Sequence, residues 1–352
     1  MNYAQELPIV DASAYFAARL QGAKASADAC AEALKLGRQI KDACHSVGMF
    51  YLVGYDIDQA LIDSVMQQSA EFFASSQSDK EAISIKNSTQ FRGYGLLKNY
   101  RDWREQIHIG VESSLPDFND TEPAAYWRLW GKNQWPASAE TVEFKSCVLT
   151  YFEAVESLAR TVLTLLAEAL DKPADFFTER MKDRPYLLMK AMSYLPQERQ
   201  NADATQMGVT AHCDWSWLTF LVQDDVGGLE AQDIEGNWRK VNPLPQSLVV
   251  NTGELLEIET GGYLRASPHR VINERIDRQR FSVPVFINPA LDAPILPAAQ
   301  SSLSGPLACA DAHVHKVIRP GTTLSSFVFG DSEFERKAKG IWCYLPECVS
   351  AL

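Results

Sequence analysis

The second half of the chain changes texture at about residue 185, and this change limits the possible folds more than any other feature. Short apolar stretches follow one another there, separated by turns such as Gly227-Gly228, Asn242-Pro243 and Gly261-Gly262. These stretches predict strands over 218–223, 229–232, 238–241, 248–251 and 280–287. Strands this short and this closely spaced are typical of a β-sandwich or barrel.

The first half is mainly helical. Apolar residues recur at helical spacing over 27–47, after Asp58, which can cap a helix, and over 140–170. Short strands are expected at 7–11 and 48–53. Helices followed by short strands predict an α+β fold built on a jelly-roll core.

We expect three parts that form one structural unit. A helical region over 1–184 packs on the core, the core spans 185–300, and an extension over 301–352 closes the pocket. The segment 75–135 is expected to be less regular, and 323–340 is expected to be helical.

His212 and Asp214 form the first half of a predicted metal site. They lie in a strand-like stretch that follows the turn at Gly208. Residues two apart in an extended chain point to the same face, so the imidazole and the carboxylate aim at one point. Iron oxygenases with two His and one carboxylate need one further His from elsewhere in the chain.

His269 is the candidate for that third ligand. It follows a Gly-Gly turn and precedes a polar turn, and several short strands separate it from His212. Two imidazoles and one carboxylate would occupy one face of an octahedral Fe(II) and leave the opposite face open for O₂. Of the other His, His313 and His315 also have ligand spacing but suit a solvated hairpin, and His45 and His108 are expected to be structural.

Arg280 and Ser282 form a second group on a predicted strand. Their two-residue spacing places the guanidinium and the hydroxyl on one face. A guanidinium fork with a neighbouring hydroxyl donor suits a carboxylate. Phe286 belongs to the same face and could touch a bound molecule.

Composition excludes several classes of partner. The net charge is −12, which argues against a nucleic acid and against an anionic membrane surface. The seven Cys are scattered and form no C-x-x-C pair, so we expect reduced thiols in a cytoplasmic protein. The first residues lack the basic and apolar segments of a secretory signal, and the apolar run within 158–170 is too short and polar to cross a bilayer.

The motifs together resemble the isopenicillin-N-synthase-like family of Fe(II)/2-oxoglutarate-dependent dioxygenases. The resemblance covers most of the chain. It depends on His212-x-Asp214, on Ser267-Pro-His-Arg-Val271 and on Arg280-x-Ser282, with Leu7–Asp11 and Arg92-Gly-Tyr94 adding weaker support.

The resemblance implies a distorted jelly roll, also called a double-stranded β-helix, with helices packed around it. His212, Asp214 and His269 would bind Fe(II), and Arg280 and Ser282 would hold the distal carboxylate of 2-oxoglutarate. Tyr194 would donate to the same carboxylate, although Leu195 stands where the family usually has Pro. The implied reaction consumes O₂ and 2-oxoglutarate, releases succinate and CO₂, and hydroxylates, desaturates or cyclises a substrate.

The substrate is expected to be a small molecule, such as an amino acid, a peptide-like compound or a secondary metabolite, bound by a monomeric protein. Trp215 and Trp217 could line the pocket or fill the barrel. Arg92 could pair with a substrate carboxylate or form a structural salt bridge. Two alternatives remain open, an oxidase or oxidative cyclase of the same fold that does not consume 2-oxoglutarate, and a binding protein that has lost the chemistry.

Overall fold

A computed structural model describes most of the chain up to residue 296. The described residues are 7–20, 27–99, 102–114, 127, 129–137, 142–182, 184–196, 207–273 and 278–296. The helices are α1 (Ser13–Leu20), α2 (Ala27–Ser46), α3 (Gln59–Ala74), α4 (Gln77–Ala82), α5 (Val142–Ala169) and α6 (Glu254–Glu259). The strands are β1 (Ile9–Asp11), β2 (Met49–Val53), β3 (Gly93–Lys98), β4 (Trp103–Gly110), β5 (Leu188–Tyr194), β6 (Met207–His212), β7 (Leu218–Gln223), β8 (Leu229–Gln232), β9 (Trp238–Lys240), β10 (Ser247–Thr252), β11 (His269–Ile272) and β12 (Arg280–Ile287).

The strands form two sheets within the described part of the chain. The larger sheet has the order β1-β2-β10-β7-β12-β5-β4-β3, and the smaller one has the order β6-β11-β8-β9. Their facing surfaces share a buried apolar cluster, to which the larger sheet contributes Tyr194, Leu221 and Val249 and the smaller sheet Leu229 and Val271. The two sheets therefore enclose a common interior, as the predicted jelly roll requires.

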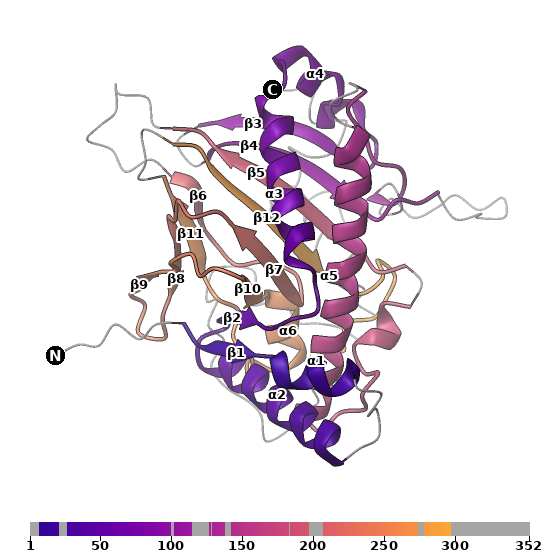
Figure 1. Cartoon of the computed structure of the whole chain (residues 1–352), viewed down its shortest axis with the longest axis vertical. Helices are drawn as coiled ribbons and strands as arrows, with labels where there is room; N and C mark the ends of the chain where they lie inside the picture. Colours follow the sequence, from indigo (N-terminus) through magenta and orange to yellow (C-terminus); the bar gives the residue numbers. More distant parts are fainter. Residues whose placement is uncertain are drawn as a thin grey trace.

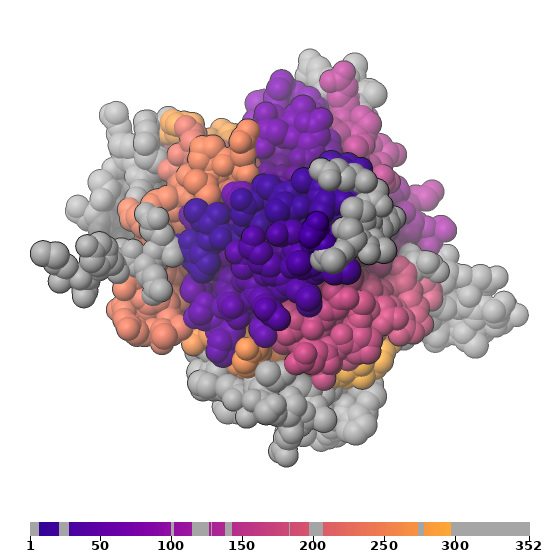
Figure 2. All heavy atoms as spheres, turned by 60° about the horizontal axis from the view of Figure 1, so that its bottom comes forward, coloured from indigo at the N-terminus to yellow at the C-terminus, as the bar shows by residue number. Residues whose placement is uncertain are grey.

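Helices cover the outer face of the larger sheet. The long helices α3 and α5 run beside each other along β5, β7 and β12, and α2 packs against α5 and β2 (Figure 1). Figure 2 shows the end of the molecule where the indigo N-terminal segment occupies the centre of the face. The α+β architecture expected from the sequence is confirmed, with the main apolar core between these helices and the sheet.

Most predicted elements are present with small changes at their ends. Strands β7, β8 and β12 have the predicted bounds, and Asp58 caps α3 by accepting a hydrogen bond from the Ala60 N–H at 3.0 Å. The expectation that 75–135 is less regular was wrong for part of that segment. Residues 93–110 contribute β3 and β4, an antiparallel pair at the edge of the larger sheet.

The first half of the chain therefore does more than pack on the core, because β1, β2, β3 and β4 all belong to the larger sheet. The predicted extension over 301–352, its helix over 323–340, and His313 and His315 lie outside the described residues. The three-part division, the monomeric state and the cytoplasmic location stay predictions. No helix within the described ranges is both long and apolar enough to cross a membrane.

Candidate metal and cofactor site

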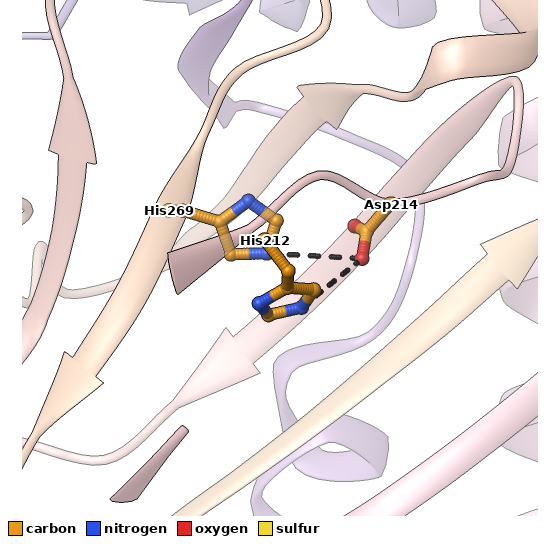
Figure 3. A group of neighbouring side chains, drawn as sticks. All are labelled: His212, Asp214 and His269. Atoms are coloured by element: carbon orange, nitrogen blue, oxygen red, sulfur yellow. Dashed lines mark ion pairs between the residues drawn. The ribbon is translucent and has the colours of Figure 1, made fainter. Parts of the chain in front are cut away.

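The smaller sheet brings the three predicted metal ligands together. His212 ends β6 and His269 begins β11, and these two residues face each other directly in the antiparallel register. Asp214 follows β6 after one residue, and its Oδ1 atom lies 3.7 Å from the Nε2 atoms of both imidazoles (Figure 3). The three candidate ligand atoms all lie within 4.8 Å of one another. The sequence prediction of their convergence is thus matched by the geometry.

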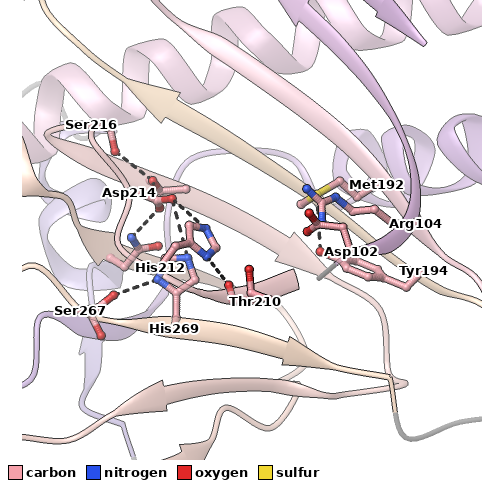
Figure 4. Close-up of polar contacts among 12 residues, drawn as sticks. Asp102, Arg104, Met192, Tyr194, Thr210, His212, Asp214, Ser216, Ser267 and His269 are labelled. Carbon is pink, nitrogen blue, oxygen red and sulfur yellow. Dashed lines mark hydrogen bonds and ion pairs between the residues drawn. The ribbon is translucent and has the colours of Figure 1, made fainter. Parts of the chain in front are cut away.

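Backbone carbonyl groups fix the orientation of both imidazoles. The Nδ1 atom of His212 is 2.9 Å from the Thr210 carbonyl oxygen, and that of His269 is 2.9 Å from the Ser267 carbonyl oxygen (Figure 4). Because a carbonyl oxygen only accepts, each Nδ1 must carry the proton. Each Nε2 atom therefore has a free lone pair directed toward Asp214, as a metal-binding His requires.

The electrostatics favour ligands in their metal-binding protonation states. The pKa of His212 is lowered to about 4, first by the protein packed around the ring and then by His269, although 42% of the side chain is exposed. Burial alone would raise the pKa of Asp214, but His269, His212 and hydrogen bonds lower it below its ordinary value. Near neutral pH the site therefore holds a carboxylate beside neutral His212, which suits a divalent first-row metal such as Fe(II).

Asp214 is held by two side chains that sequence reasoning did not assign to the site. Its Oδ2 atom accepts hydrogen bonds from Thr219 Oγ1 at 2.6 Å and from Asn251 Nδ2 at 2.8 Å. These bonds occupy Oδ2 and leave Oδ1 turned toward the imidazoles. The sequence around Asn251 suggests only a turn that supports the barrel, and the pairing of β10 with β7 is what reveals that this residue reaches Asp214.

Replacing Asn251 with Ala is expected to weaken metal binding by about tenfold to a hundredfold, the usual effect of removing a residue that orients a ligand. Isothermal titration with Mn(II) measures this change. Asn237→Ala, on an exposed turn, is the matched control and should bind Mn(II) like the wild type. Equal affinities for the two variants would show that Asn251 does not orient Asp214.

Arg280, Ser282 and Tyr194 come together on the interior face of the larger sheet. Tyr194 on β5 lies opposite Arg280 on β12, and the guanidinium is 4.7 Å from the centre of the Tyr194 ring. Arg280 Nη1 donates to Ser282 Oγ at 3.2 Å, and Ser282 Oγ donates to Tyr194 Oη at 3.4 Å. A further contact, from Arg280 Nη2 to Gln223 Oε1 at 2.8 Å, was not foreseen because the β7–β12 register cannot be read from sequence.

The Arg280 guanidinium is suited to a bound anion. It is 2% exposed, its Nε atom has no hydrogen-bond partner, and no carboxylate among the described residues forms an ion pair with it. Asp224 lies close enough to feel its charge but accepts from the Phe281 and Val226 N–H groups. A buried charge without a counter-charge is destabilising, so this site fits the carboxylate of a cofactor.

Strand β7 contributes a side chain to the predicted metal site around Asp214 and another to the group around Arg280. Thr219, which holds Asp214, and Gln223, which holds Arg280, lie on the same face of β7 because they are four residues apart. An extended strand rises about 3.3 Å per residue, so the two contacts are separated by roughly 13 Å along it. A small molecule can therefore reach from the predicted metal to the guanidinium.

The residues that the sequence suggests for substrate binding, Arg92, Trp215, Trp217 and Phe286, have different surroundings in the structure. Phe286 lies on the same face as Arg280 and Ser282, and Trp215 stacks on Tyr186 with ring centres 5.9 Å apart. The Arg92 guanidinium lies 5.8 Å from the centre of the Tyr186 ring and forms no ion pair among the described residues. Their roles in substrate binding stay predictions.

Trp217 lies in the core instead of beside these residues. It is fully buried, packs edge-on against Phe177, and donates from Nε1 to Glu259 Oε2 at 3.0 Å. Glu259 also forms a two-pronged ion pair with Arg180, whose guanidinium is 4.8 Å from the centre of the Trp217 ring. Trp217 therefore belongs to the main apolar core between the helices and the larger sheet, and it lines no part of the proposed site.

Glu259→Gln is expected to destabilise the protein by about 3–5 kcal/mol, because it leaves the Arg180 charge buried without its partner. Chemical denaturation followed by circular dichroism measures the free energy of unfolding. Glu32→Gln removes the exposed pair with Lys35 and should change that free energy by only about 0–1 kcal/mol. A small effect of Glu259→Gln would mean that the buried pair is not needed for stability.

Two family models match this chain. A model described as the N-terminal part of a non-haem dioxygenase in morphine synthesis matches residues 7–138. A second, described as the 2OG-Fe(II) oxygenase superfamily, matches residues 187–289, which include the three predicted metal ligands, Arg280 and Ser282. Both halves of the described chain are thus recognised by models of the same kind of enzyme.

Similar proteins agree with these matches. A Dictyostelium discoideum protein named as a probable iron/ascorbate oxidoreductase is 32% identical over 81% of this chain and 82% of its own length. A 2-oxoglutarate-dependent dioxygenase of Monascus ruber is 33% identical over 83% of this chain and 87% of its own length. Among solved structures, a full-length Neurospora crassa protein in complex with alpha-KG and thymine has a TM-score of 0.70 at 22% identity, and the match covers 93% of this chain and 96% of that one.

These findings do not favour the oxidase that dispenses with 2-oxoglutarate. The relatives' identities and coverage establish the family, and the site has the donor set that the family's metal requires. The chain belongs to the 2OG-Fe(II) oxygenase superfamily and is an oxygenase that uses Fe(II), 2-oxoglutarate and O₂.

Proposed function

We propose that this oxygenase binds Fe(II) through His212, Asp214 and His269 and binds 2-oxoglutarate through Arg280, Ser282 and Tyr194. The observation that carries the proposal is the position of Asp214 Oδ1, 3.7 Å from both imidazole Nε2 atoms. The buried Arg280 guanidinium on the same interior forms no ion pair with a described residue and has a free Nε atom, which supports the second half of the proposal.

The side chains prepare the site before any chemistry takes place. His212 and His269 offer Nε2 lone pairs because their Nδ1 protons are held by carbonyl groups. Arg280 and Ser282 would orient the distal carboxylate of 2-oxoglutarate so that its keto acid faces the triad. Fe(II) bound there would activate O₂, with the conversion of 2-oxoglutarate to succinate and CO₂ supplying the electrons.

The substrate of the proposed reaction is a small molecule that is hydroxylated, desaturated or cyclised. The names of relatives support this range, since they include a homoarginine-6-hydroxylase of Glycine max and a clavatol oxidase of Penicillium crustosum. Amino acids, peptide-like compounds and secondary metabolites therefore remain the substrate classes to test. Phe286 and Trp215 would contact the body of such a molecule.

Succinate formation tests the proposed function. Purified protein supplied with Fe(II), 2-oxoglutarate, ascorbate and O₂ is expected to release succinate slowly alone and faster with a substrate. Omission of Fe(II), and separately of 2-oxoglutarate, should stop the reaction. Oxidation of a substrate at an unchanged rate without 2-oxoglutarate would favour the oxidase alternative, and ligand binding without O₂ uptake would favour the binding protein.

A further inference from the structure

Basic side chains lie on the same face of the larger sheet as the proposed 2-oxoglutarate site. His108 on β4 and Lys190 on β5 are directly opposite each other in the antiparallel register. Lys190 shares the face of β5 that carries Tyr194, because residues an even number apart on a strand point the same way. The Lys190 Nζ atom is 5.0 Å from the centre of the Phe286 ring on neighbouring β12.

Arg92 completes this group by lying over Gly110, two residues after His108 on β4. A Cβ atom at position 110 would lie 2.0 Å from Arg92 Nη2 and 2.2 Å from its Cζ. Any residue larger than Gly would therefore displace the guanidinium. The missing side chain at position 110 leaves the space in which Arg92 reaches the face of β4 that carries His108. We call Arg92, His108 and Lys190 the basic group.

The nitrogen atoms of the basic group have few protein partners. Arg92 is 1% exposed and donates from Nη2 to the Leu129 carbonyl oxygen at 3.0 Å, but its Nε and Nη1 atoms have no partner. His108 is 2% exposed, and both of its ring nitrogens are unpaired. Lys190 forms no hydrogen bond or ion pair with a described residue. Buried polar atoms are rarely left unpaired in proteins, so the unpaired nitrogen atoms of Arg92 and His108 indicate a ligand.

The charges around Lys190 do not balance without such a ligand. The acidic groups that act on it are Asp214 and Asp102. Asp102 forms an ion pair with Arg104, and Asp214 belongs to the proposed metal site. The positive charges of Arg92 and Lys190 therefore face no uncommitted carboxylate among the described residues.

The protonation states suit recognition of an anion. Burial and then Arg104 lower the pKa of Lys190 to about 8, which leaves the ammonium charged at neutral pH. Burial, followed by the charges of Lys190, Arg92 and Arg104, lowers the pKa of His108 well below its ordinary value. A neutral imidazole between two cations can still donate one hydrogen bond.

We propose that Arg92, His108 and Lys190 bind a carboxylate of the primary substrate, which makes the substrate a small organic acid. The Nε and Nη1 atoms of Arg92 are free to donate to a carboxylate, and the Lys190 ammonium adds a point charge. Phe286 beside Lys190, and Tyr186 beside Arg92, provide apolar surface for the rest of the molecule. This inference rests on the proposed function, because it needs Arg280 to hold the co-substrate separately.

Matched pairs of ligands test the proposal without knowledge of the natural substrate. The protein is loaded with Mn(II) and saturated with 2-oxoglutarate under nitrogen, and calorimetry then measures the Kd of phenylacetate, 3-phenylpropionate, indole-3-acetate and octanoate. Each acid is compared with its primary amide, which has nearly the same shape without the charge. At least one acid is expected to bind roughly tenfold to a hundredfold more tightly than its amide, as charged hydrogen bonds allow.

Variants of the basic group show whether these residues cause the preference for the acid over its amide. Lys190→Met and Arg92→Gln should reduce the preference for the acid at least severalfold, whereas Lys190→Arg, which keeps the charge, should retain it. Lys98→Met, at an exposed position beside Trp103, is the control and should behave like the wild type. Arg92 is buried and its variant could unfold, but Lys190 is only partly buried and has no hydrogen bond to lose.

The outcomes separate this inference from the proposed function. Failure of the wild type to bind Mn(II) and 2-oxoglutarate would overturn the proposed function. Normal binding of both, with no acid preferred to its amide or with no acid bound, would overturn only the carboxylate subsite. A preference that survives in Lys190→Met and Arg92→Gln would overturn it as well.

Discussion

Replacing Asp214 with Ala is expected to abolish succinate formation and specific metal binding. The carboxylate is the only anionic member of the triad, and its Oδ1 atom lies between the two imidazoles. Its removal leaves two neutral donors to hold a divalent cation. The loss should exceed the roughly tenfold to hundredfold effect of removing a residue that merely orients a ligand.

Anaerobic calorimetry with Mn(II) and a succinate assay measure the two losses. Asp225→Ala, at an exposed site that pairs with Arg278, is the matched control and should retain both properties. His269→Ala removes a proposed ligand from a different strand and should give the same result as Asp214→Ala. Undiminished turnover in Asp214→Ala would contradict the assignment of the metal ligands.

Replacing Arg280 with Leu is expected to raise the Kd for 2-oxoglutarate strongly while the metal triad remains. The variant removes the buried guanidinium that has no acidic partner in the described chain. Loss of one member of a buried, hydrogen-bonded charge pair costs about 2–5 kcal/mol, which corresponds to a roughly thirtyfold or larger change in Kd. Most of the effect should appear in the concentration of 2-oxoglutarate needed for half-maximal turnover.

Arg278→Leu provides a close control, because Arg278 lies two residues before Arg280 and forms an exposed ion pair with Asp225. Titration of 2-oxoglutarate into the Mn(II)-loaded variants compares the two positions directly. Similar affinities in Arg280→Leu and the wild type would place the co-substrate elsewhere. Loss of Mn(II) binding in Arg280→Leu would indicate a damaged fold instead.

Short-range patterns made much of the site predictable. His212 and Asp214, like Arg280 and Ser282, are two residues apart, and a strand places such pairs on one face. His269 is a candidate from sequence because it follows a Gly-Gly turn and several short strands separate it from His212, and the pairing of β11 with β6 brings it opposite His212. Periodicity likewise predicted α2, α3 and α5, because each buries one continuous apolar stripe.

Residues whose roles depend on strand pairing could not be predicted in the same way. Asn251 reaches Asp214 only because β10 pairs with β7, and Gln223 reaches Arg280 only because β7 pairs with β12. β3 and β4 were missed since their sequences mix polar and apolar residues, as expected for strands whose interior face carries His108 and Gln106. Polar residues at an interior face weaken the apolar alternation that marks a strand.

A crystal structure with Mn(II) and 2-oxoglutarate, grown without O₂, tests the central claim most directly. We predict an anomalous peak within bonding distance of the Nε2 atoms of His212 and His269 and a carboxylate oxygen of Asp214. The distal carboxylate of 2-oxoglutarate should contact Arg280 and Ser282. A metal bound away from Asp214, or a co-substrate that leaves Arg280 unpaired, would contradict the proposed site.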